Sequence, residues 1–453
     1  MEKIRFYFRL VLSGMLVVLL SGCAGRDVDT LSQSGVSGNH IEIMAKEPES
    51  ADIGAIENET LKEDQSMQEG DDAEDTAETE ATDETEQGMI GAENVTGKRE
   101  PVKVKGIYVS GPIAGHARME ELITLVEETE LNAMVIDVKN DDGRITYKMQ
   151  SDTVLEIDAG MGYIQDIDAL VKKCKEKNIY LIARIVAFRD PYLAEKKPEL
   201  AVKTLTGETF RDKNGLAWVN PYKKEVWDYL MEVAEGAIET GFDEIQFDYI
   251  RFSTDLKAGE TYFGPEAEKI SKIDIITQFT EYAYETLSPL GAYVAADVFG
   301  TVIDNETDQA IVGQDYVQMA RHLDYICPMV YPSHYANGAY GIAIPDAEPY
   351  QTIYAAMNSS AEVLGSLTKE KAKVRVWLQS FTASWVPGHI SYGREQIREQ
   401  IKGAFDAGYE EWILWNAAVK YQRDSLLTDE EADAEREQWE IEKTEPTNTV
   451  SGN

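Results

Sequence analysis

Eight short runs rich in β-branched residues alternate with amphipathic helical stripes between Val102 and Asp424. Strands that are separated by helices need crossover connections and therefore pair in parallel. The predicted strands are Val104–Val109, Ala133–Val138, Tyr180–Ala187, Glu244–Asp248, Ala292–Asp297, Tyr325–Val330, Val374–Ser380 and Trp412–Trp415. Eight such units predict a closed (β/α)8 TIM barrel, which is an α/β fold. An open doubly wound sheet is the rival fold, but no glycine-rich phosphate turn follows the first strand.

The helices and loops of the pattern also fit a barrel. Met119, Leu122, Ile123 and Val126 follow the i, i+3, i+4, i+7 spacing of an amphipathic helix. Glycines that follow helical stripes mark helix ends, and they are Gly241, Gly291 and Gly408. Long segments follow the third, fourth and sixth strands, at 189–221, 253–271 and 331–349. Long loops on that side of a barrel build its catalytic face.

The N-terminal 22 residues have the pattern of an export signal. Lys3, Arg5 and Arg9 precede a short apolar run, which is typical of a signal peptide. The run ends in Leu20-Ser21-Gly22-Cys23, which resembles the lipobox of bacterial lipoproteins. This resemblance implies cleavage before Cys23, a lipid on its sulfur, and a protein that is anchored to the cell membrane outside the cytoplasm. The alternative is an unlipidated signal peptide.

The charge of the chain is concentrated outside the barrel pattern. The chain has 82 acidic and 43 basic residues, for a net charge of -39, which argues against nucleic acid as a partner. Residues 23–101 are rich in Glu, Asp, Thr and Ser without aromatics, and this composition predicts a disordered acidic tether. Residues 425–453 are predicted to form a charged C-terminal tail. The barrel is expected over 102–424.

Metal and cofactor chemistry finds little support in the residue types. Three cysteines (Cys23, Cys174, Cys327) and five histidines give neither a disulfide framework nor a histidine-based metal motif. We therefore expect no metal and no cofactor.

Three carboxylates lie at the C-terminal ends of predicted strands, the end of a barrel where active sites are found. Asp137, Asp248 and Asp297 lie at the C-terminal ends of three predicted strands, where a charge is costly unless it has a partner or a task. The two-residue period of a strand points Asp248 into the barrel mouth, together with Gln246. Asp190 precedes a proline and reads as a turn residue. The alternative to a catalytic cluster is a structural salt-bridge layer that closes the barrel.

Two carboxylates in a cleft without metal ligands or a Ser/Cys nucleophile motif fit the cleavage of a glycosidic bond. Lys139, Arg184 and Arg251 are the expected cationic partners, and aromatic and polar side chains near the strand ends are expected to bind sugar. The predicted substrate-binding residues are Lys139, Arg184, Tyr249, Arg251, Tyr331, His334, Gln379, Trp385, Trp415 and Asn416.

Five segments resemble the putative glycosyl hydrolase family, a bacterial family of glycoside-hydrolase-like TIM barrels distantly similar to the α-amylase group. They are Lys105–Tyr108, Val135–Lys139, Asp243–Phe252, Pro328–Pro332 and Leu414–Asn416. The resemblance implies Asp248 as nucleophile and Asp297 as acid/base. The chain departs from amylases at Asp297, where they use glutamate, and at Gln246, where they use arginine.

Two functional hypotheses remain open from the sequence. The first is a surface-anchored glycoside hydrolase that cleaves a cell-wall or environmental polysaccharide. The second is a lipoprotein of the cell envelope whose barrel binds glycan without turnover. The distance between the two carboxyl groups and the partners of each carboxylate would discriminate between them.

Overall fold

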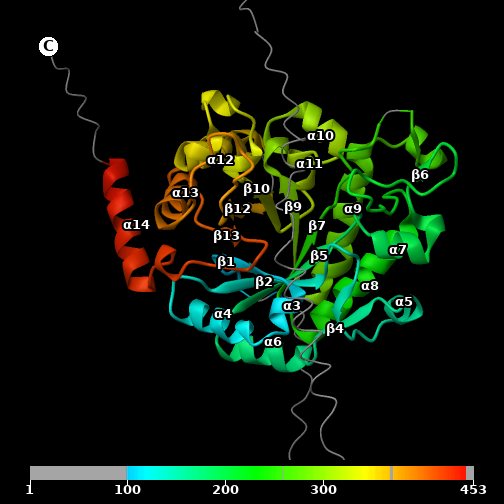
Figure 1. Ribbon diagram of the computed structural model, residues 1–453, viewed down its shortest axis with the longest axis horizontal. Coiled ribbons are helices and arrows are strands. Elements are labelled where there is room, and N and C mark those ends of the chain that lie inside the picture. Colours follow the sequence, from blue (N-terminus) through cyan, green and yellow to red (C-terminus); the bar gives the residue numbers. More distant parts are fainter. Residues whose placement is uncertain (1–97, 99, 258, 368–370, 445–453) are drawn as a thin grey trace, which may run out of the picture. The chain divides into compact units, whose positions relative to one another are not determined.

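The computed structural model describes residues 98, 100–257, 259–367 and 371–444. The predicted signal peptide, Cys23 and nearly all of the predicted tether lie outside the described residues. Eight parallel strands form a closed barrel in the order β1-β2-β5-β7-β9-β10-β12-β13, because β1 pairs with both β2 and β13. This confirms the predicted TIM barrel. Figure 1 shows the strands at the centre, with the helices outside them.

The barrel strands match the predicted runs to within two residues at most ends. They are β1 Lys105–Val109, β2 Ala133–Lys139, β5 Tyr180–Val186, β7 Glu244–Asp248, β9 Tyr293–Phe299, β10 Tyr325–Met329, β12 Val376–Gln379 and β13 Trp412–Trp415. The seventh predicted strand is divided, since β11 (Lys373–Val374) pairs with β10 and Arg375 separates it from β12.

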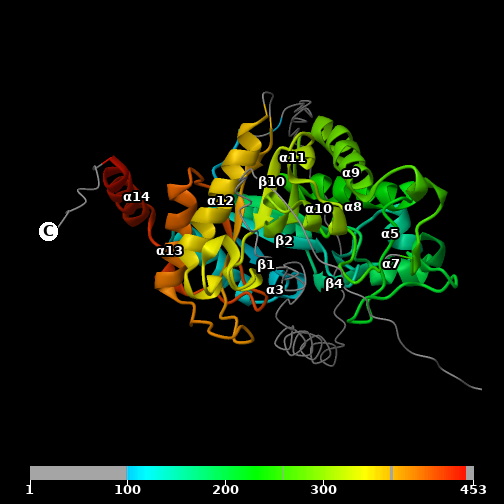
Figure 2. The same cartoon turned by 90° about the horizontal axis from the view of Figure 1, so that it is seen from above.

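Helices connect successive barrel strands. They are α3 Gly111–Ala114, α4 Arg118–Glu127, α5 Asp152–Glu156, α6 Ile167–Glu176, α7 Pro191–Lys196, α8 Lys224–Thr240, α9 Lys272–Leu287, α10 Glu306–Val312, α11 Tyr316–Met319, α12 Pro349–Gly365 and α13 Arg394–Asp406. Figure 2 shows α12 beside α13 on the outside of the barrel. The helices bury one face each, as in α8, where Val226, Leu230 and Val233 are fully buried.

Glycine ends α8 as the sequence predicted. Gly241 has a φ of 105°, in the left-handed region that side chains with a Cβ rarely adopt. Its backbone N–H donates to the last carbonyls of the helix, so the chain turns directly into β7.

Short strands outside the barrel extend its C-terminal side. β3 (Ile145–Tyr147) pairs antiparallel with β2, and β4 (Gly160–Ile164) pairs with β3. β6 (Lys203–Thr204) and β8 (Thr261–Tyr262) join the long segments that follow β5 and β7. The sequence predicted these segments as loops, and they are partly ordered by this pairing.

A buried ion pair closes the opposite end of the barrel. Arg375 Nη1 lies 2.6 Å from Glu244 Oε1, and neither side chain is exposed. Tyr180 donates to the other oxygen of Glu244 at 3.0 Å, and Arg375 also pairs with Glu411 at 3.0 Å. Glu244 and Asp248 therefore occupy the two ends of the same strand, each with an arginine partner.

The folded unit continues past the predicted barrel boundary at residue 424. Within the predicted tail, α14 (Asp429–Thr444) packs on α13, where the ring of Trp439 lies 5.3 Å from that of Phe405. Arg398 of α13 pairs with Glu435. In the part of the chain that the structure describes, no helix is both long enough and apolar enough to cross a membrane.

Candidate active site

Four adjacent barrel strands each place one charged side chain at the same end of the barrel interior. Asp137 lies on β2, Arg184 on β5, Asp248 on β7 and Asp297 on β9, and all four are buried. Asp137 and Arg184 are paired in the β2–β5 register. Asp248 and Asp297 each follow the last pair of the β7–β9 register, Phe247 and Ala296, by one residue. The three carboxylates therefore lie at the same end of the barrel interior.

Arg184 is the centre of this cluster. Its Nη2 and Nε lie 2.6 and 3.0 Å from Oδ2 of Asp248, and its Nη1 lies 2.8 Å from Oδ1 of Asp137. The same Nη1 donates to Asp141, in the turn after β2, at 3.1 Å. One guanidinium therefore neutralises part of the charge of three carboxylates, which is the arrangement that its fixed fork of donors allows.

The backbone after Asp248 completes the environment of that carboxylate. Tyr249 has a φ of 52°, which is uncommon for an aromatic residue and is found at functional sites. In this conformation its backbone N–H donates to Oδ1 of Asp248 at 2.6 Å. Asp248 thus accepts hydrogen bonds on both oxygens, from a cation and from an amide.

Asp297 has a different environment from Asp248. Gln246 Nε2 and Trp377 Nε1 both donate to its Oδ1, each at 2.6 Å, whereas no side chain or amide of the described residues donates to its Oδ2. Burial and then the negative charge of Asp248 raise the pKa of Asp297 well above its usual range. The two neighbouring carboxyl groups therefore differ: Asp248 is paired with a cation, whereas the pKa of Asp297 is raised.

The pKa values of Asp137, on β2, and Asp141, in the turn after β2, are shifted in opposite directions. Burial raises the pKa of Asp137 to about 6, although Arg184 opposes the shift. Tyr108 donates to its Oδ2 at 2.6 Å. For Asp141, burial is outweighed by Arg184 and Arg189, so that its pKa falls to about 2. Asp141 is about one-third exposed and lies at the rim of the cluster.

Lys139 and Arg251, predicted as partners of the cluster, have other neighbours. Lys139 is fully buried and lies 2.8 Å from Asp190, which also caps the N-terminus of α7 through Leu193. Arg251 is buried, with its guanidinium 4.4 Å from the ring of Phe299. The sequence context of Asp190 suggested a turn residue, and in the structure Asp190 is the N-cap of α7.

Two predicted aromatic residues border the cluster. The half-buried ring of Trp415 lies 4.2 Å from that of Tyr108 and 5.6 Å from the Arg184 guanidinium. The ring of Tyr249 lies 4.1 Å from the guanidinium of Arg189, and its hydroxyl accepts from the same group. Both rings therefore lie beside guanidinium groups of the cluster, Trp415 beside Arg184 and Tyr249 beside Arg189.

The predicted residues of the loops after β10 and β12 form a separate aromatic group. Tyr331 and His334 are buried, with rings 5.2 Å apart, and burial lowers the pKa of His334 to about 4. Trp385 is 37% exposed and stacks on Phe381 at 6.0 Å. This group offers one exposed aromatic face, that of Trp385.

Gln379 and Asn416 have internal partners. Gln379 is fully buried and donates to Asp346 at 3.0 Å, while its carbonyl accepts from the Ser333 amide. Asn416 donates to the Ser380 carbonyl at 2.5 Å and accepts from the Ala418 amide. Their hydrogen bonds order the loops after β10, β12 and β13.

Sequence reasoning missed several members of the cluster. They are Tyr108, Asp141, Arg189 and Trp377, and Gln246 was placed in the interior without a partner. The Asn140-Asp141-Asp142-Gly143 turn directly after a strand that ends in charged residues was a usable signal for Asp141. Among the described residues, no group of three or more His, Cys, Asp or Glu side chains has the arrangement of a metal site.

Fold and site define a (β/α)8 barrel with a cluster of carboxyl groups at the C-terminal ends of its strands. The chain belongs to the family described as "Putative glycosyl hydrolase domain", whose model matches residues 106–421. This match confirms the family suggested by the sequence motifs, and it supports a glycoside-hydrolase-like function. A search of curated proteins found no match.

Two solved structures illustrate the likeness. The glycoside hydrolase domain of PgaB (BpsB) from Bordetella bronchiseptica is 14% identical, with a TM-score of 0.53 over 74% of this chain and 98% of that chain. A hypothetical protein from Ruminiclostridium thermocellum ATCC 27405 is 41% identical over 42% of this chain and 97% of that chain, with a TM-score of 0.39. At 14% identity the first likeness concerns the fold alone.

Proposed function

We propose that this protein is a glycoside hydrolase that cleaves a cell-wall or environmental polysaccharide with two carboxyl groups, Asp297 and Asp248. The observation that carries the proposal is the contrast between these neighbours. Glycosidic cleavage needs one carboxyl group that is protonated and a second that is ionised, and the environment must hold their pKa values apart.

Asp297 is the proposed general acid. Its Oδ1 already accepts two hydrogen bonds, so the proton that burial and Asp248 retain belongs on Oδ2, where no described residue donates. A proton in that position is available to the oxygen of a leaving sugar. Gln246 and Trp377 hold the carboxyl group in one orientation, and in this role they are positioning residues.

Asp248 is the proposed partner that attacks or stabilises the oxocarbenium-like carbon. Arg184 and the Tyr249 amide donate to both of its oxygens and hold the carboxyl group in place. The half-buried Trp415 and the exposed face of Trp385 supply rings on which the apolar faces of sugars can pack.

Asp248→Asn tests the proposal. The full chain is screened against a panel of polysaccharides, including starch, chitosan and peptidoglycan, with release of reducing ends as the readout. We expect at least one substrate to be cleaved, and we expect the variant to lose about 10²-fold or more of kcat/KM because its amide has no charge.

Glu244→Gln is the matched control. It removes a buried carboxylate with an arginine partner from the same strand, but at the far end of the barrel. Its turnover should match that of the unaltered protein whenever circular dichroism shows it folded. Equal losses in both variants, or retained turnover in Asp248→Asn, would contradict the assignment of Asp248.

One observation favours a second candidate, a barrel that binds glycan without turnover. The ion pairs of Arg184 with Asp137 and Asp248 have the form of the structural salt-bridge layer considered above. If no member of the panel is cleaved while a glycan still binds, and binding is unchanged by Asp248→Asn, the binding function replaces the enzymatic one.

We also propose that Cys23 carries a lipid that anchors the barrel outside the cytoplasmic membrane. The support is the Leu20-Ser21-Gly22-Cys23 sequence after a short apolar run. Expressed in a bacterium, the full chain should partition into the detergent phase of Triton X-114, whereas Cys23→Ser should remain in the aqueous phase. Equal partition of the two would refute lipidation.

A further inference from the structure

A cavity of about 720 Å³ lies between the segments that follow β7 and β9. These are the strands that carry Asp248 and Asp297, so the cavity is on the same side of the barrel as the carboxyl cluster. Its walls include Leu256, Thr261, Phe263, Lys272, Thr307 and Ile311. The volume is within the range of small-molecule sites.

Lys272 is the notable polar group of this cavity. It is the first residue of α9, and its ammonium donates to the Ile311 carbonyl in the last turn of α10 at 3.0 Å. An ammonium has three donors, and no carboxylate of the described residues pairs with this one. Burial lowers the pKa of Lys272. The Ile311 carbonyl and the ring of Phe252, whose centroid is 5.0 Å from the ammonium, therefore stabilise this charge, but no carboxylate of the described residues does.

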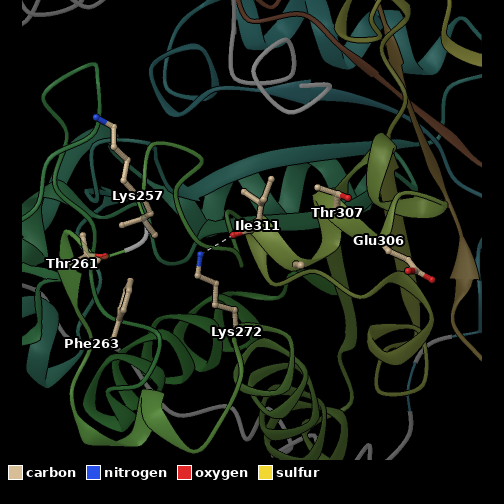
Figure 3. A pocket seen from close by; sticks show the side chains of 10 residues that line it. Lys257, Thr261, Phe263, Lys272, Glu306, Thr307 and Ile311 are labelled. Atoms are coloured by element: carbon tan, nitrogen blue, oxygen red, sulfur yellow. Dashed lines mark hydrogen bonds between the residues drawn. The ribbon is translucent and has the colours of Figure 1, made fainter. Parts of the chain in front are cut away.

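The other charged residues of the cavity wall do not act as counter-ions of Lys272. Figure 3 shows the Lys272 ammonium directed at Ile311 in the middle of the cavity, while the carboxylate of Glu306 lies beyond Thr307 and points away from it. Lys257 also points outward in this view. Lys272 has no carboxylate partner among the described residues, and an anionic ligand would supply the missing charge.

The other walls suit a sugar ring. Phe263 is half-buried and lies across the cavity from Ile311 and Thr307, so that it contributes aromatic surface to the wall. Thr261 and Thr307 carry hydroxyl groups that can donate to or accept from sugar hydroxyls. Leu256 and Ile311 provide apolar surface beside them.

We propose that this cavity binds a sugar residue that bears a carboxylate, with the carboxylate on Lys272 and the ring against Phe263. The sugar class rests on the proposed function, whereas the negative charge of the ligand rests on Lys272 itself. The protein would then select an acidic saccharide through a site built from the loops next to its catalytic strands.

The test measures binding to the full chain by isothermal titration calorimetry, with trigalacturonate as the acidic probe and maltotriose as the neutral one. Trigalacturonate should bind about tenfold or more tightly than maltotriose, because a charge-assisted hydrogen bond to lysine is added. Lys272→Met keeps the stem of the side chain and should weaken trigalacturonate binding by about tenfold or more. Lys269→Met makes the same change of charge outside the cavity and should leave the affinity unaltered.

Four outcomes would overturn the inference: no binding of trigalacturonate, equal binding of the neutral sugar, an unchanged affinity in Lys272→Met, or an equal loss in Lys269→Met. Acetate and phosphate that bind as tightly as trigalacturonate would also overturn it, because the site would then hold an anion without a sugar. The result is separable from the proposed function. Asp248→Asn should bind trigalacturonate normally, so binding can be found where the turnover screen fails, and turnover can be found where binding at Lys272 fails.

Discussion

Arg184→Met should lower the free energy of unfolding by about 3–5 kcal/mol at neutral pH, because the variant leaves buried carboxylates without their cation. Asp137 and Asp248 are both buried, and Arg184 is bonded to each of them. Methionine fills most of the volume of the side chain, so that the loss reports charge more than packing. Urea unfolding followed by circular dichroism measures the change.

The destabilisation should also depend on pH in a defined direction. Burial already raises the pKa of Asp137 to about 6, with Arg184 opposing the shift, so removal of Arg184 raises that pKa further. A folded-state pKa above the unfolded value means that stability is lost as pH rises and is regained as pH falls. Arg184→Met should therefore recover part of its lost stability between about pH 7.5 and about pH 5.

Two companion variants make the result specific. Arg189→Met removes a guanidinium that also contacts Asp141, but at a more exposed position, and should cost about 1 kcal/mol or less. The double variant Arg184→Met with Asp248→Asn should be more stable than the sum of the single changes predicts, since one unpaired charge is gone. A pH-independent loss in Arg184→Met would show that packing, and not charge, accounts for the effect.

The sequence predicted which strand residues face the interior at this site, because barrel geometry follows from short-range patterns of apolar and polar residues. A period of two along β7 determines that Gln246 and Asp248 face the interior while Phe247 faces the helices, and the Phe247 ring indeed packs 5.4 Å from Phe279 of α9. Parallel order then brings Asp137, Asp248 and the other strand-end groups to one end of the barrel.

The pairing of charges within the site could not be predicted in the same way. Lys139 and Arg184 both lie at the ends of neighbouring strands, and their side chains are long enough to reach several carboxylates. Which carboxylate each cation pairs with depends on differences of a few ångströms. Lys139 pairs with Asp190, outside the cluster, while Arg184 pairs with Asp137 and Asp248. Such distances are set by tertiary packing, which a strand period does not contain.

Loop residues were the least predictable part of the site. Gln379 was expected to bind substrate because it ends a strand, yet its amide ties Asp346 to the backbone of Ser333. The turn after β2 marks Asp141 only as a polar residue near a strand end, and its importance comes from Arg184 and Arg189, which are more than forty residues away in the chain. A polar residue near a strand end can therefore either belong to the charged cluster or order a loop, and only its partners in the structure distinguish these two roles.

Asp297→Asn should slow the cleavage of substrates whose leaving group must be protonated, and it should have little effect on substrates whose leaving group departs without a proton. For the polysaccharide found in the screen, kcat/KM should fall about 10²–10⁴-fold, the usual contribution of a general acid. A 2,4-dinitrophenyl glycoside of the same sugar should be cleaved nearly as fast as by the unaltered protein, because its leaving group departs without protonation. Asp248→Asn should instead lose turnover on both substrates, because it acts at the carbon.

The pH profile provides an independent check on the same residue. The raised pKa of Asp297 extends its acid form to higher pH than an ordinary aspartate allows, so activity on the polysaccharide should persist to a correspondingly higher pH and then decline as pH rises. Trp377→Phe removes one donor that stabilises the ionised carboxylate, so it should raise that pKa and move the alkaline decline to higher pH. If Asp297→Asn slows the activated glycoside as much as the polysaccharide, or if the alkaline decline does not move in Trp377→Phe, a residue other than Asp297 supplies the proton.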